Sequence, residues 1–167
     1  DALDEAFYMT FGFVIPTNMR ILIALDVSGS MHMGCIANTN ISVAEAAAAM
    51  SMVTARTEKN YEIVGFTDGG KYSGASMHYG YHSAISPLDI TPRRRLDDIC
   101  NYTRNLPFGG TDCALPMIYA KGEKKKFDAF IVYTDNETWA GDIKPFQALK
   151  QYRDAMGINA RLVVVGM

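Results

Sequence analysis

The chain has 167 residues, of which 49% are hydrophobic, and this is enough for one domain with a substantial core. Its 16 basic and 18 acidic residues give a net charge of -2, so any nucleic-acid binding through overall positive charge is excluded and would need a local patch or another domain. The three cysteines, Cys35, Cys100 and Cys113, are too few for a disulfide framework and favour a reducing compartment.

The first half of the chain predicts an arm, two strands and one helix. Leu3, Phe7 and Phe11 have helical spacing in the opening residues 1–19, which we expect to lie outside the core. An apolar strand follows at 20–26. Ser42 and Glu45 have the spacing of a capping box, which predicts a helix that runs to about residue 58. The next strand is expected at 61–67.

The second half predicts further alternating elements. Thr91 and Pro92 indicate the start of a helix, and Gly157 has the position of a glycine that follows a helix end. The expected elements are an edge strand within 72–86, helices at about 91–106, 112–121 and 145–156, and strands at 127–134 and 160–165.

The alternation of strands and helices predicts an α/β fold, with a doubly wound, mostly parallel sheet and helices on both faces. The strands at 20–26, 127–134 and 160–165 are apolar throughout, as is typical of buried parallel strands. In the doubly wound order 3-2-1-4-5-6, the first and fourth strands are neighbours. We therefore expect Asp26 and Asp135, each at the end of a strand, to meet at the carboxyl edge of the sheet.

Oxygen-bearing side chains gather at these strand ends. Asp26, Ser28 and Ser30 alternate along a loop that Gly29 allows to bend. Together with Thr111 and Asp135 they predict an oxygen-only site for Mg²⁺, with Mn²⁺ or Ca²⁺ as alternatives. Three of the five ligands are neutral hydroxyls, so the ion keeps its affinity for an outside anion. The adjoining Asp112 and Glu137 are expected to accept hydrogen bonds around the ligands.

These five residues match, position by position, the metal-ion-dependent adhesion site (MIDAS) of von Willebrand factor A domains. Four longer segments resemble the A domain of the Ro autoantigens, which are RNA-binding proteins of the TROVE family. They are residues 43–59, 109–120, 130–141 and 147–167. The opening residues 2–17 resemble the stretch that joins the helical-repeat ring of that family to its A domain.

The resemblance implies an A domain over residues 20–167, preceded by the end of a linker at 1–19. It also implies that the ring, which holds noncoding Y RNAs and misfolded RNAs in this family, lies outside this chain. We therefore expect the main RNA-binding surface to be elsewhere. Family A domains continue through a sixth strand and a final helix, whereas we expect the resemblance to reach only about the fifth strand. A missing sixth strand would expose the fifth strand or let the opening arm fill the gap.

The resulting functional hypothesis is a non-enzymatic binding module of a ribonucleoprotein. It would capture an acidic group of a protein partner, or an RNA phosphate, through Mg²⁺. We expect a monomer in the cytoplasm, with the nucleus as a second location and no membrane contact. A separate RNA-backbone patch is predicted from the basic residues Arg93, Arg94, Arg95, Lys124, Lys125 and Lys126.

Other functions remain open at this stage. An extracellular adhesion domain has the same fold, although the sparse cysteines argue against it. A Mg²⁺-dependent phosphohydrolase could use Asp26 as nucleophile, but the second acid that such enzymes carry two residues later is here Ser28. A zinc site at His78 and His82 is disfavoured, because on a strand the two would lie about 13 Å apart. Cys113 is expected to be a small buried residue rather than a reactive thiol.

Overall fold

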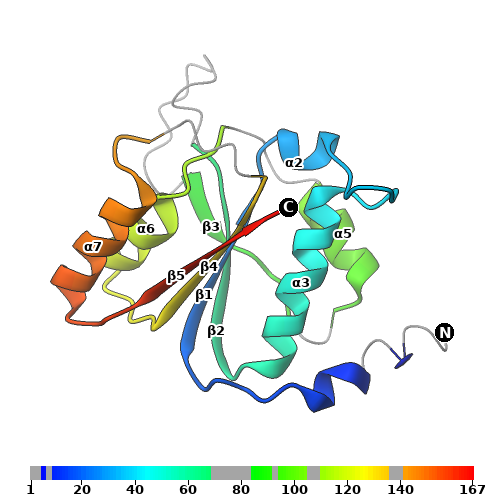
Figure 1. Cartoon of the computed structure of the whole chain (residues 1–167), viewed down its shortest axis with the longest axis horizontal. Coiled ribbons are helices and arrows are strands. Elements are labelled where there is room, and N and C mark those ends of the chain that lie inside the picture. Colours follow the sequence, from blue (N-terminus) through cyan, green and yellow to red (C-terminus); the bar gives the residue numbers. More distant parts are fainter. Residues whose placement is uncertain (1–4, 7–8, 69–83, 92–93, 105–109, 136–140) are drawn as a thin grey trace.

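The structure is a computed structural model that describes residues 5–6, 9–68, 84–91, 94–104, 110–135 and 141–167. A five-stranded sheet has the order β3-β2-β1-β4-β5 (Figure 1). All its pairings are parallel except that of β3 with β2. The strands are β1 (Arg20–Asp26), β2 (Asn60–Phe66), β3 (Ile85–Pro87), β4 (Ala129–Thr134) and β5 (Arg161–Gly166). The predicted α/β class and the neighbouring positions of the first and fourth strands are confirmed.

The helices cover both faces of the sheet. They are η1 (Thr10–Phe13), α2 (Ser30–Met33), α3 (Val43–Thr57), α5 (Leu96–Arg104), α6 (Leu115–Gly122) and α7 (Pro145–Met156). Helices α6 and α7 lie on one face, and α3 and α5 lie on the other (Figure 1). Within the described residues, none of the helices has the length and apolar character needed to cross a bilayer.

Strand β1 is apolar throughout because it packs on both faces. Leu22 and Ala24 join the core cluster under α6 and α7, whereas Ile23 and Leu25 join the cluster under α3. All four side chains are 2% exposed or less. The central position of β1 thus explains why its sequence does not alternate between apolar and polar residues.

Two predicted helix boundaries are confirmed, and the starts of two other helices are shifted. Helix α6 begins at Leu115 rather than at about residue 112. The capping box before α3 forms, with Ser42 N donating to Glu45 Oε2 at 2.9 Å. Helix α7 ends before Gly157, which is left-handed with φ 66°. Helix α5 begins at Leu96 rather than near Thr91, because the preceding segment turns: Arg94 Nη1 donates to the carbonyl of Asp89 at 2.6 Å.

Strand β5 corrects the prediction of a buried strand at 160–165. Val163 and Val164 are 47% and 48% exposed. Among the described strands, β5 pairs with β4 alone and forms the edge of the sheet. Its apolar sequence therefore reflects a strand whose two faces are only partly covered, and the run of apolar residues did not reveal this.

The opening arm is attached to the end of α3. Thr17 N and Asn18 N donate to the carboxylate of Glu58 at 2.8 and 3.2 Å. The Arg56 guanidinium lies 5.6 Å from the centre of the Phe11 ring. The helical segment expected from Leu3 to Phe11 agrees with the described part of the arm, where Glu5, Ala6 and Met9 are α-helical and the short helix η1 follows. Leu3 and Phe7 themselves lie outside the described residues.

An ion pair joins the start of β1 to the residue that precedes β4. Arg20 Nε and Arg20 N both donate to Asp128 Oδ2 at 2.9 Å. The Arg20 hydrogen bonds lower the pKa of Asp128 from its ordinary value near 3.8 to about 2. The folded pKa is thus below the unfolded one, so the stabilisation is complete above about pH 4 and is lost as the pH falls toward 2.

We therefore expect Asp128→Asn to lower the free energy of unfolding at pH 7 by about 1 kcal/mol, since solvent screens this half-exposed pair. The difference from wild type should shrink as the pH falls below about 4. Urea unfolding between pH 7 and pH 3 measures both effects. Asp154→Asn, which breaks the exposed pair with Lys150, is the control and should change stability little. A difference in stability between Asp128→Asn and wild type that does not change with pH would contradict the link to the lowered pKa of Asp128.

Candidate metal centre

The candidate site lies at the carboxyl edge of the sheet. The loop from β1 to α2, the segment that enters α6 and the end of β4 all reach this edge (Figure 1). Asp26 is the last residue of β1, and Thr134 is the last residue of β4. Because β1 and β4 are paired in parallel, their ends bring together residues that are 108 positions apart.

The Asp26 carboxylate is held from two sides. Its Oδ1 accepts a hydrogen bond from Ser28 N at 2.9 Å, and its Oδ2 accepts one from Thr134 Oγ1 at 2.8 Å. The residue is 2% exposed. Burial raises the pKa of Asp26 above its ordinary value, and the charge of Asp135 raises it further, while the hydrogen bonds from Ser28 and Thr134 oppose the shift. A cation at this place would favour the charged carboxylate.

The two loop serines converge. Ser28 Oγ and Ser30 Oγ are 3.1 Å apart. Ligands at 2.0–2.1 Å on adjacent corners of an octahedron are separated by about 2.9 Å, so the two hydroxyls fit neighbouring positions around Mg²⁺. Ser28 is buried and Ser30 is half-buried. Fully buried Met31 anchors the turn that carries Ser30.

The other predicted ligands lie on neighbouring segments. Asp135 is half-buried and directly follows Thr134, the last residue of β4, whose side chain contacts Asp26. Thr111 is 1% exposed on the segment that enters α6. Asp112 is buried, and its Oδ1 accepts a hydrogen bond from Ala114 N at 3.0 Å. Glu137 lies outside the described residues.

Two residues at this edge were not singled out from the sequence. Thr134 orients Asp26, and the predicted pairing of the two strands could have revealed it, since it is the last residue before Asp135. Asp68 is a second one: it is 7% exposed and follows β2, the other neighbour of β1. An acidic residue directly after a predicted strand was the available signal for Asp68.

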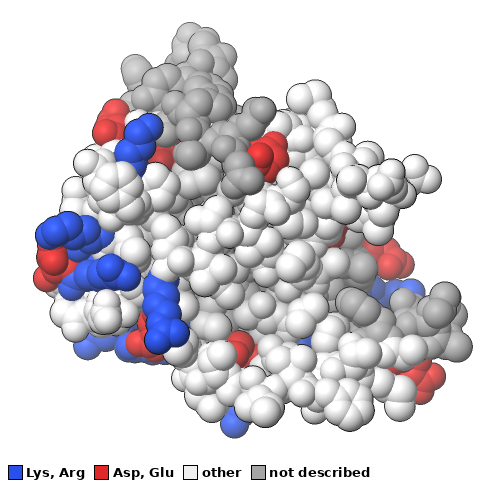
Figure 2. All heavy atoms as spheres, viewed as in Figure 1, with Lys and Arg blue, Asp and Glu red and all other residues white. Residues whose placement is uncertain are grey.

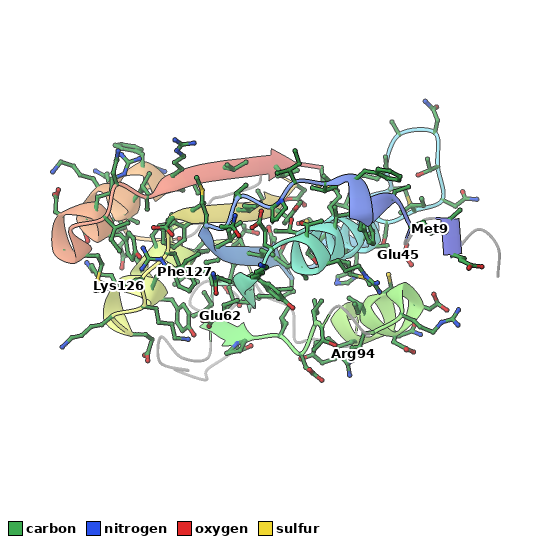
Figure 3. The ribbon with its side chains drawn as sticks, turned by 90° about the horizontal axis from the view of Figure 1, so that it is seen from below. Met9, Glu45, Glu62, Arg94, Lys126 and Phe127 are labelled. Atoms are coloured by element: carbon green, nitrogen blue, oxygen red, sulfur yellow. The ribbon has the colours of Figure 1, made fainter. Side chains whose placement is uncertain are left out.

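Two of the described basic residues predicted to form an RNA patch are well separated. Lys and Arg side chains gather over α6 and α7, interspersed with acidic ones (Figure 2). Arg94 and Lys126 lie far apart, on opposite sides of the middle of the molecule (Figure 3). Several of these cations also have acidic neighbours, since Arg95 pairs with Asp97 at 3.6 Å and Lys125 with Glu62 at 2.7 Å. Arg93 lies outside the described residues, and Lys124 is exposed near Lys125.

Alternative metal chemistry has little support in the described part of the chain. No group of three or more His, Cys, Asp or Glu residues gathers among the described residues. His78 and His82 lie outside them. Cys113 is 4% exposed, as expected for a small buried residue. The candidate site therefore combines acidic side chains with hydroxyls, which is the donor set suited to a hard cation.

Comparison with known proteins agrees with this fold. The chain is 44% identical over 168 residues to the RNA-binding protein RO60 of Deinococcus radiodurans and 40% identical over 168 residues to that of Caenorhabditis elegans. Both alignments cover the whole of this chain, but they cover only 29% and 24% of the length of these relatives.

A solved structure and a family model give the same result. The crystal structure of the Deinococcus radiodurans RO (RSR) protein matches 99% of this chain and 31% of that chain, with a TM-score of 0.82 and 44% identity. The model of the Ro60 vWA domain matches residues 20–167, which begin at the first residue of β1. The chain therefore belongs to the family of Ro60 von Willebrand factor A domains.

Proposed function

We propose that this chain is the metal-dependent binding module of a Ro-like ribonucleoprotein, and that it captures an acidic group of a partner protein through Mg²⁺. The observation that carries the proposal is the pair of serine hydroxyls 3.1 Å apart beside the buried carboxylate of Asp26. The proposed ligands are Asp26, Ser28, Ser30, Thr111 and Asp135.

The chain's own residues explain how such a site would work. Ser28 N and Thr134 Oγ1 donate to the two oxygens of the Asp26 carboxylate and so hold its orientation. The neutral hydroxyls of Ser28 and Ser30 supply oxygens without adding negative charge. Bound Mg²⁺, or alternatively Mn²⁺ or Ca²⁺, would supply a coordination position for an anionic oxygen from outside.

A binding role suits this donor set better than catalysis. The second residue after Asp26 is Ser28, so the loop lacks the acid that a carboxylate nucleophile would need beside it. The named relatives are described as RNA-binding proteins and not as enzymes. Both points support a module that holds a partner, with no chemical step at the metal.

RNA binding belongs to the same proposal, but mainly through other parts of the protein. The matched relatives are three to four times as long as this chain, which leaves room for a separate RNA-binding region in them. The balanced charge and the separation of Arg94 from Lys126 argue that this module contacts RNA weakly. We propose that it acts as a monomeric unit in the cytoplasm or nucleus, and that Y RNAs or misfolded RNAs are held elsewhere.

The first test is metal binding by the chain itself. Isothermal titration should show one site for Mg²⁺ or Mn²⁺, and the ion should raise the melting temperature by mass action. Ser28→Ala should weaken binding by at least about tenfold, because it removes a ligand. Ser51→Ala is the matched control, since Ser51 is also a buried serine but donates to the carbonyl of Ala48 on α3. Neither heat nor a thermal shift with either ion would refute the proposal.

A further inference from the structure

The loop that carries the candidate serine ligands continues into a surface without formal charge. Between Asp26 and Glu45 the sequence contains no Asp, Glu, Lys or Arg. Two apolar side chains project from this stretch: Met33 is 83% exposed and Ile41 is 51% exposed. The surface over α2 and the following loop is accordingly uncharged (Figure 2). We call Met33 and Ile41 the apolar rim.

Met33 is placed next to a candidate ligand by the helical turn. Ser30 and Met33 are the first and last residues of α2, and residues three apart on a helix are neighbours, with about 5–6 Å between their Cβ atoms. Met31 on the same turn is fully buried and fixes its orientation. An apolar group that contacts Met33 would therefore lie beside an oxygen bound at the Ser30 end of the turn.

Ile41 is held close to the end of α2 by backbone hydrogen bonds. Val43 N donates to the carbonyl of Gly34 at 3.1 Å, and Ile36 N donates to that of Ile41 at 2.9 Å. Cys35 and Ser42 form an antiparallel bridge between these two contacts. One exposed apolar side chain would need no explanation, but two on one pinned turn, with Met33 a helical turn from the candidate ligand Ser30, form a contact surface.

The composition of this surface distinguishes the classes of partner. An RNA backbone is bound largely through Lys and Arg, and the stretch from Asp26 to Glu45 has neither. Its ionisable side chains are those of His32 and Cys35. A protein segment with a carboxylate and adjacent apolar side chains matches both parts of the surface: the carboxylate meets the cation and its apolar neighbours meet Met33 and Ile41.

We propose that the partner of this module is a protein segment in which an Asp or Glu is flanked by apolar residues, and that Met33 and Ile41 determine this specificity. The inference rests on the proposed function, because the carboxylate requires the cation. It goes further by assigning a specificity role to two residues that are not metal ligands.

Three capped tripeptides test the proposal in the presence of Mg²⁺. The wild-type chain should bind acetyl-Leu-Glu-Leu-amide about tenfold more tightly than acetyl-Ser-Glu-Ser-amide, because two partly buried leucines contribute on that order. It should not bind acetyl-Leu-Gln-Leu-amide, which lacks the carboxylate. The double variant Met33→Ser, Ile41→Ser should lose the preference and keep its affinity for Mg²⁺. Met50→Ser, which changes an exposed methionine on α3, should keep the preference.

The titration with Mg²⁺ alone separates the two levels of the hypothesis. If the chain binds Mg²⁺ normally but has equal affinity for the two glutamate peptides, the proposed role of the apolar rim is wrong and the proposed function remains intact. Loss of the preference in Met50→Ser also overturns the rim, since the effect would not be local. Absence of Mg²⁺ binding overturns both. If the chain binds a ten-nucleotide oligouridylate more tightly than any of the peptides, and only with Mg²⁺, the proposal of a protein partner is wrong and an RNA phosphate is favoured.

Discussion

Asp26→Asn is expected to abolish Mg²⁺ binding while leaving the metal-free chain at least as stable as the wild type. Asn cannot supply the negative charge, so the affinity should fall by more than about 100-fold. The amide oxygen can still accept the hydrogen bond from Ser28 N, which preserves the turn. The substitution also removes a buried charge whose pKa is raised by burial and by Asp135, and this relieves an unfavourable interaction in the folded state.

Thermal unfolding with and without Mg²⁺ measures both halves of this result. The wild type should be stabilised by the ion and the variant should not, although the two melt at similar temperatures without it. Asp97→Asn, on the exposed side of α5, is the control and should respond to Mg²⁺ as the wild type does. A variant that still gains stability from Mg²⁺ would show that Asp26 is not a ligand.

Gly141→Ala is expected to destabilise the chain by about 2–4 kcal/mol. Gly141 has φ 96°, a conformation that strains any residue with a side chain. A Cβ at this position would also lie 2.5 Å from the carboxylate of Asp112. A shift of the carboxylate to make room would disturb its hydrogen bond from Ala114 N, which orders the segment between Thr111 and α6.

The matched control for this variant is Gly157→Ala. Gly157 is also left-handed, with φ 66°, but a Cβ there would have no heavy atom within 4 Å. This variant should cost only the backbone strain of about 1 kcal/mol. Urea unfolding of both variants gives the comparison, and Mg²⁺ titration of Gly141→Ala should show weakened binding. Equal losses of stability in the two variants would mean that the contact with Asp112 contributes nothing.

Local patterns in the sequence were sufficient for the elements around the site. Strand β1 has the predicted bounds, because a strand with both faces covered is apolar at every position. The capping box of Ser42 and Glu45 is encoded within four residues, so it could be recognised without the fold. Even the meeting of the ends of β1 and β4 could be predicted, since it follows from strand order alone.

Contacts between distant parts of the chain could not be predicted in this way. Apolar runs at 20–26 and 160–165 look alike, yet one is a central strand and the other an edge strand with exposed Val163 and Val164. The basic clusters around Arg94 and Lys126 could have formed one patch, but the fold places Arg94 far from Lys126. In both cases the deciding factor is which surface covers a residue, and nothing near that residue in the sequence specifies it.

The amino-acid sequence by itself therefore determined the fold class, the order of the strands and the type of atoms at the carboxyl edge. Only the tertiary structure decided that Thr134 orients Asp26 and that Met33 and Ile41 remain exposed after the serine loop. The physical reason is range: periodicity and capping depend on residues a few positions apart, whereas side-chain hydrogen bonds and burial depend on neighbours brought in by the whole packed sheet.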